Sequence, residues 1–273
     1  MILNAKNGTL PIRDTVIDWL KFGYGEKVLV MIPGLGDAFK TAKGMALPFA
    51  LMYRQLAKDY TVYYFSRRRV LPEGFTTKDM AADLYACMKS LGLEVADVFG
   101  VSEGGMIAQH LAIDHPECVD KLILAVTIPF ADAVSREAIG SWLAWADDED
   151  GYQKIFLDTA KRSYTPEYLK KSRLVNEVMA RFTAPASMDN FRVQANACLS
   201  HDTRDLLSKI TAGTLIIGAA EDDVVGVRGS YLLHEGIADS QLYVYPGYSH
   251  GVYEEAKDFL PRIMAFLKEG EEE

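Results

Sequence analysis

The sequence predicts an α/β fold, in which helices cover both faces of a mostly parallel central sheet. Short apolar runs rich in β-branched residues alternate along the chain with longer amphipathic runs of helical period. Several short runs are apolar on both faces, such as VLVMI at residues 28–32 and LILAV at residues 122–126. Continuous apolar runs of this length are typical of parallel strands that are buried between two layers of helices.

The predicted elements follow this alternation in chain order. The strands share a short apolar character: Thr15–Leu20, Val28–Ile32, Thr61–Phe65, Asp97–Val101, Leu122–Val126, Thr214–Ile217 and Leu242–Tyr245. The helices have apolar residues at helical spacing: Pro48–Lys58, Thr77–Leu91, Glu103–Asp114 and Glu254–Lys268. We therefore expect a sheet whose connections are mostly helices.

A third observation concerns the middle of the chain, where the alternation stops. Residues 129–208 are helical in pattern throughout, and Pro166 and Pro185 punctuate them as prolines at helix starts do. The strand pattern resumes afterwards with TLIIGA. We therefore expect one α/β core domain, formed by residues 1–128 and 209–273, with an all-helical insertion at residues 129–208.

Charge and composition narrow the classes of partner. The formal net charge is −9, and an acidic chain repels nucleic acid and gains nothing at an anionic membrane surface. The N-terminus does not have the pattern of a signal peptide, and no apolar run is long enough for a transmembrane helix. The cysteines, Cys87, Cys118 and Cys198, are far apart and form no CxxC pair. We therefore expect a cytoplasmic protein that acts on a small molecule, and the sequence leaves its oligomeric state open.

The stretch VFGVSEGGMIAQHLAIDHPE carries the strongest chemical signal. Ser102 lies between a predicted strand and a predicted helix, with Gly100 two residues before it and Gly104 two residues after it. A strand that runs directly into a helix needs a tight, strained turn, and this G-x-S-x-G setting exposes a nucleophilic hydroxyl. The alternative is that Ser102 only caps the helix. The strand–turn–helix context favours the nucleophile.

A serine nucleophile needs a base, and His250 is the best placed of five histidines. It lies in the loop PGYSHG after the last predicted strand, at the sheet edge where ligands and catalytic groups gather. His110, His115, His201 and His234 lie in helical stretches, where we expect surface or helix-end histidines.

The base needs a carboxylate to orient it, and the residues themselves leave that carboxylate open. The loop after TLIIG contains Glu221, Asp222 and Asp223, and Asp132 follows another strand. Acyl transfer also needs donors for an oxyanion. We expect the N–H of Glu103 to be one donor and the glycine-rich loop at residues 33–37 to supply the other, although a simple turn explains that loop equally well.

These features together resemble the α/β-hydrolase superfamily, specifically its small serine hydrolases of the esterase and lipase type, which have a helical lid. The similarity extends over nearly the whole chain. The family order is nucleophile, acid, histidine, which implies a triad of Ser102, Asp222 and His250. The resemblance also implies an α/β-hydrolase fold in which residues 129–208 are a lid inserted after the sixth strand.

Two loops depart slightly from the pattern of that family. The sequence Asp222-Asp223-Val224-Val225-Gly226 matches the family's acid loop with glycine in place of proline, and this alignment selects Asp222. Pro33-Gly34 stands where the family has His-Gly, which implies that the N–H of Leu35 is the second oxyanion donor.

The resemblance implies hydrolysis of a carboxylic ester or thioester of a small, apolar substrate through an acyl-enzyme on Ser102. The same triad also permits C–C bond or amide hydrolysis and lyase chemistry, and a homologue that only binds a ligand is a further alternative. No phosphate-binding loop, dinucleotide fingerprint or metal-ligand spacing occurs in a fitting context, so we predict no cofactor and no metal.

Two groups of residues have weaker signals. Met106, Phe130, Trp142 and Trp145 are candidates for the substrate pocket, although aromatic residues in a helical insertion more often hold its helices together. The run at residues 67–69, RRR, follows a predicted strand and could attract an anionic substrate, but we expect a solvated charge run.

Overall fold

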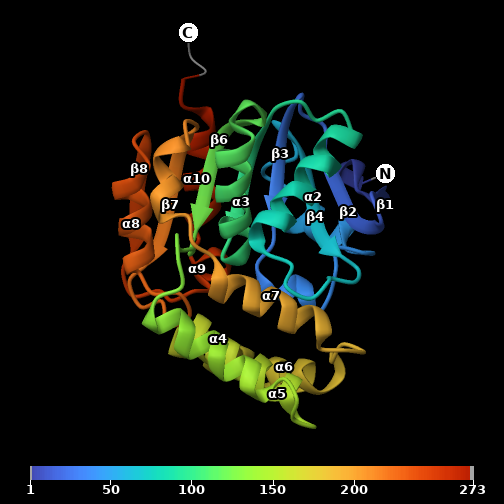
Figure 1. Cartoon of the computed structure of the whole chain (residues 1–273), viewed down its shortest axis with the longest axis vertical. Coiled ribbons are helices and arrows are strands. Elements are labelled where there is room, and N and C mark those ends of the chain that lie inside the picture. The colour runs from blue at the N-terminus through green and yellow to red at the C-terminus, as the bar shows by residue number, and fades with distance from the viewer. Residues whose placement is uncertain (1, 271–273) are drawn as a thin grey trace.

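The computed structural model describes residues 2–270, and Figure 1 shows a central sheet with helices on both of its faces. Within these residues the sheet has eight strands in the order β1-β2-β4-β3-β5-β6-β7-β8. Only β1 with β2 and β2 with β4 pair antiparallel, and the other neighbours are parallel. The predicted α/β fold with a mostly parallel sheet is confirmed.

Each predicted apolar run lies in a strand, except that β6 ends one residue before the predicted Val126, and most strands extend beyond the predicted run: β1 (Lys6–Ile12), β2 (Thr15–Gly23), β3 (Lys27–Ile32), β4 (Tyr60–Arg68), β5 (Ala96–Val101), β6 (Val119–Ala125), β7 (Gly213–Ala219) and β8 (Ser240–Tyr245). The prediction misses β1, because this edge strand, KNGTLPI, is mostly exposed and has no apolar alternation. Its Pro11 is tolerated because an edge strand has one side without ladder hydrogen bonds.

The core helices are α1 (Ala46–Met52), α2 (Thr77–Ser90), α3 (Glu103–Asp114), α8 (Arg228–Gly236), α9 (Val252–Glu255) and α10 (Phe259–Lys268). The bounds of α3 agree with the prediction, and α1 ends earlier than predicted. The predicted helix Glu254–Lys268 is two helices, because the backbone at Ala256 is extended. The short helix α8 is not predicted from the sequence.

Alternate residues of the buried strands supply two apolar cores. Val30 and Ile32 of β3 belong to the cluster that also contains side chains of α2 and α3. Leu29 and Met31 belong to the cluster on the other face, with side chains of α1 and α10. This alternation follows from the two-residue period of a strand and explains why VLVMI is apolar throughout.

Between β6 and β7 the chain forms α4 (Ala133–Trp145), α5 (Gly151–Ser163), α6 (Pro166–Phe182) and α7 (Asp189–Ser200). These helices, called the helical segment below, all fall within residues 129–208, and Figure 1 places them beyond the ends of β6 and β7 at the lower side of the view. A third apolar cluster joins α4, α5 and α7 to Met106 and Val225 of the core. Their role as a lid stays a prediction.

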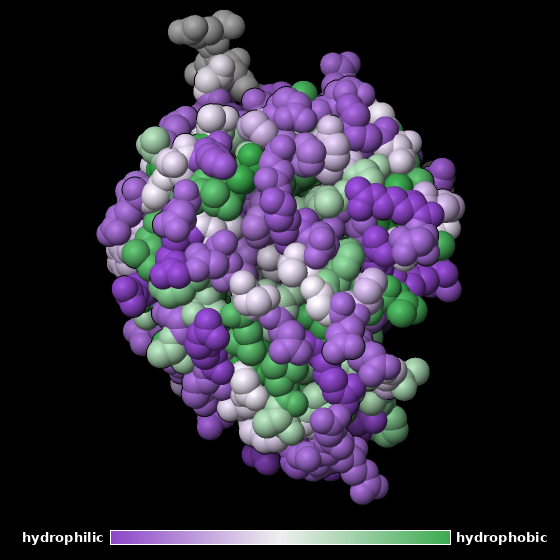
Figure 2. All heavy atoms as spheres, viewed as in Figure 1, coloured by the Kyte–Doolittle hydropathy of each residue, from purple (hydrophilic) through white to green (hydrophobic). Residues whose placement is uncertain are grey.

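The surface of the described residues is mixed in character. Hydrophilic side chains cover most of the face seen in Figure 2, and hydrophobic side chains form smaller groups between them. Within residues 2–270, no helix combines the length and the apolar character that crossing a bilayer requires.

Candidate active site

The turn at Ser102 has the geometry that the glycine spacing predicts. Ser102 has φ 56° and ψ −121°, a left-handed conformation that a residue other than glycine adopts only under strain. A Cβ on Gly100 would lie 2.4 Å from the carbonyl oxygen of Gly104, and a Cβ on Gly104 would lie 2.1 Å from that of Ile32. The Ser102 side chain makes no capping hydrogen bond to α3, so the helix-cap alternative does not fit the structure.

Ser102, His250 and Asp222 come from the loops after β5, β8 and β7, and hydrogen bonds join them. His250 Nε2 lies 3.0 Å from Ser102 Oγ, and His250 Nδ1 lies 2.9 Å from Asp222 Oδ2. Asp222 and His250 are buried. This is the arrangement of a nucleophile, a base and an orienting carboxylate.

Asp222 is held as a carboxylate by its surroundings. Its Oδ1 accepts hydrogen bonds from the N–H groups of Val224 and Val225, each at 2.9 Å. Burial alone would raise the pKa of the Asp222 carboxyl, but His250 and these two N–H groups outweigh it, and the pKa lies below its ordinary value. Asp222 is therefore the charged partner that an imidazolium at His250 would need.

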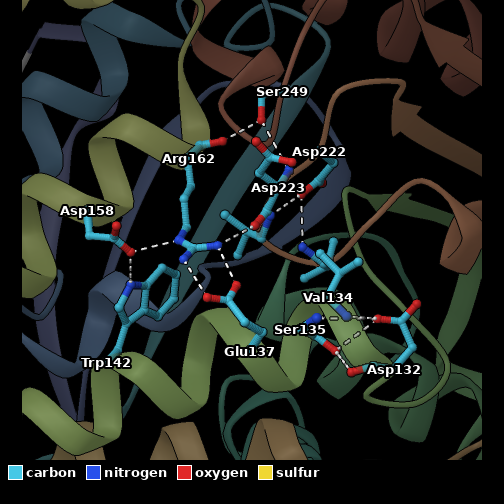
Figure 3. A network of polar contacts seen from close by, with 12 residues as sticks. Asp132, Val134, Ser135, Glu137, Trp142, Asp158, Arg162, Asp222, Asp223 and Ser249 are labelled. Atoms are coloured by element: carbon cyan, nitrogen blue, oxygen red, sulfur yellow. Dashed lines mark hydrogen bonds and ion pairs between the residues drawn. The ribbon is translucent and has the colours of Figure 1, made fainter.

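The other candidate acids have different positions. Glu221 and Asp223 are exposed, and Asp132 caps α4 by accepting hydrogen bonds from the N–H groups of Val134 and Ser135, as Figure 3 shows. The structure thus brings only Asp222, of the acids left open by the sequence, to His250.

The remaining histidines lie away from Ser102, and two of them differ from expectation. His234 is exposed and His115 ends α3, as expected. His110 and His201 are buried and their rings meet edge to face, with centroids 5.2 Å apart. His201 Nδ1 lies 2.9 Å from the hydroxyl of Thr77, and burial lowers the pKa of His201 to about 3. Both are therefore buried and not at the surface: the prediction is wrong for His110, which lies inside α3, whereas His201 ends α7 as a helix-end histidine but is buried against α2 and α3.

The glycine-rich loop after β3 lies directly against Ser102. A Cβ on Gly34 would be 3.2 Å from the Cβ of Ser102 and 3.7 Å from its Oγ. Leu35 begins the short 3₁₀ helix η2 (Leu35–Ala38), and Glu103 begins α3. The first N–H groups of a helix have no partner inside it, and neither of these two N–H groups donates a hydrogen bond to another part of residues 2–270. Both are thus open donors beside the serine.

A cavity of about 420 Å³ adjoins Ser102 and His250. Of the predicted pocket residues, Met106 and Trp142 line it, and Phe130 and Trp145 do not. Phe130 lies instead under the guanidinium of Arg204, 4.2 Å from the ring centroid. Trp145, at the end of α4, packs against the third apolar cluster. The prediction is wrong for Phe130 and Trp145, because their packing leaves both side chains outside the lining of the cavity.

Three tyrosines that line the cavity were not predicted. The side chains of Tyr53, Tyr64 and Tyr253 line it, and their hydroxyls make no hydrogen bond within the described part of the chain. Burial raises the pKa of Tyr53 to about 12 and the pKa of Tyr64 and Tyr253 above 10, so all three are neutral phenols. Tyr53 follows α1, Tyr64 lies on β4 and Tyr253 lies on α9, and no local pattern relates such distant positions.

The arginine run at residues 67–69 is the largest departure from expectation. Arg67 and Arg68 are buried, because β4 continues to Arg68 and carries both residues into the sheet. Arg67 pairs with Glu103 at 2.9 Å, Arg68 with Asp83, and only Arg69 is exposed. The solvated charge run is therefore wrong for two of the three residues.

Arg162 on α5 joins the helical segment to the loops that carry Asp222 and His250. Its guanidinium contacts Asp158, Glu137 and the carbonyl of Asp223, and its own carbonyl accepts a hydrogen bond from Ser249, as Figure 3 shows. The N–H of Gly251 also donates to the carbonyl of Ser163 at 2.7 Å. Both neighbours of His250 are thus bonded to the last turn of α5.

Comparison with known proteins agrees with this fold. A family profile described as the alpha/beta hydrolase fold matches residues 27–257. A 3-oxoadipate enol-lactonase 2 of Acinetobacter baylyi is 26% identical over 263 residues, which cover 95% of this chain and 96% of that protein. RutD of Yersinia enterocolitica, named as a candidate carbamate hydrolase, is 27% identical over 223 residues, 79% of this chain and 77% of its own length. The crystal structure of an enol-lactonase from Burkholderia xenovorans superposes with a TM-score of 0.82 at 18% identity and covers 96% of this chain and 100% of that one.

Proposed function

The chain belongs to the α/β-hydrolase fold family, and from this premise we propose that it is a serine hydrolase that cleaves a small carboxylic ester or thioester through an acyl-enzyme on Ser102. The observation that carries the proposal is the 3.0 Å contact between Ser102 Oγ and His250 Nε2, backed by Asp222 at 2.9 Å from Nδ1. A hydroxyl becomes a nucleophile only when a base takes its proton, and this contact offers that base.

In this mechanism the Nδ1–H of His250 donates to Asp222, which leaves Nε2 as the acceptor. Nε2 takes the proton of Ser102 while Oγ attacks the carbonyl carbon. The resulting oxyanion accepts hydrogen bonds from the N–H groups of Leu35 and Glu103. When the intermediate collapses, His250 gives the proton to the leaving alkoxide or thiolate. A water molecule then attacks the acyl-enzyme in the same way and releases the carboxylic acid.

The cavity suggests which substrates to test. Its volume of about 420 Å³ suits a small molecule, and its lining combines apolar side chains such as Met106 and Trp142 with the hydroxyls of Tyr53, Tyr64 and Tyr253. We propose a substrate with an apolar part and a second, uncharged hydrogen-bonding group. The two relatives are named as an enol-lactonase and as a candidate carbamate hydrolase, so lactones and carbamates belong among the substrates to test.

Hydrolysis of p-nitrophenyl acetate and butyrate tests the proposal. We expect the wild-type protein to turn over at least one of these esters, with a burst of p-nitrophenol if deacylation is slow, and Ser102→Ala to lower kcat by at least about 10⁴-fold. Equal rates for the two proteins would contradict it. If the wild type is inactive on esters but cleaves anilides, carbamates or β-diketones with the same dependence on Ser102, the amide or C–C bond alternative replaces the ester.

A further inference from the structure

We propose that Arg67, together with Glu103, is a positioning residue that holds the two oxyanion donors, the N–H groups of Leu35 and Glu103, at a constant separation. The inference rests on the proposed function, because it takes Leu35 and Glu103 as the donors. Leu35 belongs to the loop after β3 and Glu103 to the first turn of α3, so the two N–H groups come from segments that are far apart in the sequence. Some part of the structure must hold these two segments at a constant separation, since donors act only when they are preorganised.

One nitrogen of Arg67 contacts both segments. Nη2 donates to the carbonyl of Pro33, two residues before Leu35, and to Oε2 of Glu103 at 2.9 Å. Glu103 is the residue whose own N–H is the second donor. A displacement of either segment would therefore break a hydrogen bond to the same guanidinium.

The backbone of Arg67 holds the other end of the loop. Its N–H donates to Oδ2 of Asp37 at 2.7 Å, and Asp37 stands two residues after Leu35. Pro33 and Asp37 thus flank Leu35 symmetrically, and both are bonded to Arg67. This arrangement restrains Leu35 without any contact between Arg67 and Leu35 itself.

An irregularity in the pairing of β4 with β2 determines the position of Arg67. In the pairing of β2 with β4, Trp19 is opposite Phe65 and Ile17 is opposite Arg68, so two residues of β4 stand opposite Asp18 alone. Arg67 is one of those two residues. An extra residue of this kind bends a strand and redirects side chains, and such bulges are common beside active sites.

The buried cluster of Arg67, Glu103 and Asp37 is poorly suited to a role in stability alone. Arg67, Glu103 and Asp37 are at most 5% exposed, and two carboxyl groups share one guanidinium there. Nε and Nη1 of Arg67, Oε1 of Glu103 and Oδ1 of Asp37 have no hydrogen-bond partner within residues 2–270. Buried ion pairs with unsatisfied atoms contribute little net stability compared with apolar side chains of the same size. The hydrogen bonds of Arg67 to the carbonyl of Pro33 and to the carboxylate of Asp37 instead restrain the loop that carries Leu35.

The test compares Arg67→Lys and Glu103→Gln with Arg68→Lys, a matched change at the next residue. Lysine keeps the charge of Arg67 but has no planar fork that can contact two segments at once. With a p-nitrophenyl ester, we expect Arg67→Lys to lower kcat roughly 10- to 100-fold, which is less than the loss that follows complete removal of one oxyanion donor. We expect KM to change by less than about threefold. The inhibition constant of a trifluoromethyl ketone, which forms an oxyanion on Ser102, should rise by the same factor as kcat falls.

Thermal unfolding of each variant separates positioning from loss of fold. Arg68→Lys is expected to lower Tm but to leave kcat and the inhibition constant within about twofold of the wild type, since the Arg68 pair contacts neither donor segment. The role of Arg67 is overturned if Arg67→Lys and Glu103→Gln leave kcat unchanged, or if kcat falls only in proportion to Tm in every variant. If the wild type itself hydrolyses no ester, the proposed function fails first, and the role of Arg67 fails with it.

Discussion

Arg67 and Arg68 are consecutive residues at the end of β4, and both are buried, but their surroundings differ. Arg68 Nε and Nη2 meet the two carboxylate oxygens of Asp83 on α2 at 2.5 and 3.0 Å, and its Nη1 reaches Asp14. Arg67 contacts the loop beside Ser102 and the first turn of α3, and two of its nitrogens have no partner in the described residues. The fork of Arg68 is used in full to join a helix to the sheet.

This difference separates a buried charge that stabilises the fold from one that we propose to position a site. A side chain that exists for stability has its polar atoms satisfied, because each unsatisfied buried atom costs about 1–3 kcal/mol. A side chain that restrains a site can leave polar atoms unsatisfied when its contacts fix a backbone that the reaction uses. The two regions should therefore respond in opposite ways to mutation.

The largest expected effect compares two buried carboxylates, Asp222 beside His250 and Asp83 beside Arg68. Asp222→Asn should lower kcat by about 10⁴-fold, because His250 loses the partner that fixes its tautomer and stabilises its charged form. Asp83→Asn should leave kcat within about twofold, since Asp83 contacts Arg68 and Arg13 and no residue of the triad. Steady-state kinetics on the same ester measures both. A similar loss of kcat in the two variants would contradict the different roles of Asp222 and Asp83.

The second-largest expected effect is a loss of stability when Arg68 is replaced. Arg68→Met leaves the carboxylate of Asp83 buried without its main partner, and we expect the free energy of unfolding to fall by about 3–5 kcal/mol. Arg68→Met combined with Asp83→Leu should recover much of this loss, because an apolar pair of similar volume needs no hydrogen bonds. Urea unfolding followed by circular dichroism measures both variants. Failure of the double variant to recover stability would show that the pair itself stabilises the fold.

The third effect is the pH dependence of the Arg67 region. The pKa of Glu103 is raised from 4.5 to about 7, because burial, opposed by Arg67 and reinforced by Asp37, disfavours the charged carboxylate. Cys198 also faces Glu103. A raised pKa means that the folded state disfavours the charged carboxylate, so the stabilising contribution is complete below pH 4.5 and is lost as the pH rises to about 7.

Glu103→Gln removes that titration. We expect the unfolding free energy of the wild type, measured relative to Glu103→Gln, to fall by on the order of 3 kcal/mol as the pH rises from about 4.5 to about 7, since one pKa unit corresponds to about 1.4 kcal/mol. Glu73→Gln, at an exposed position, controls for the loss of one carboxylate. If the two unfolding free energies differ by a constant amount across this pH range, Glu103 remains charged. Attraction to Arg67 would then outweigh the effect of burial on the Glu103 carboxylate.

The sequence predicts the sheet and the turn at Ser102 because both are local patterns. The limits of α3 follow from the strand before it and the glycines around Ser102, and Asp222 follows from the acid loop that the family resemblance aligns. The edge strand β1 is mostly exposed and has its apolar residues, Leu10 and Ile12, only at its end, so no pattern marks it.

Burial of Arg67 and Arg68 cannot be predicted locally, because their partners lie 36 and 15 residues away along the chain. The same holds for the tyrosines of the cavity, which three separate elements bring together. Phe130 and Trp145 illustrate the reverse case. Phe130 is near the site in the sequence and Trp145 is an aromatic residue of the helical insertion, but Phe130 packs under Arg204 and Trp145 packs against the third apolar cluster.

The most direct test of the account is covalent labelling with a fluorophosphonate, followed by intact mass and peptide mass spectrometry. A fluorophosphonate reacts with a serine only when a base activates it and donors hold the developing charge. The account predicts a single adduct on Ser102 of the wild type, none on Ser102→Ala, and slower labelling of Arg67→Lys than of Arg68→Lys. A folded wild-type protein that takes up no adduct, or equal labelling of Ser102→Ala, would contradict it and favour a protein that only binds its ligand.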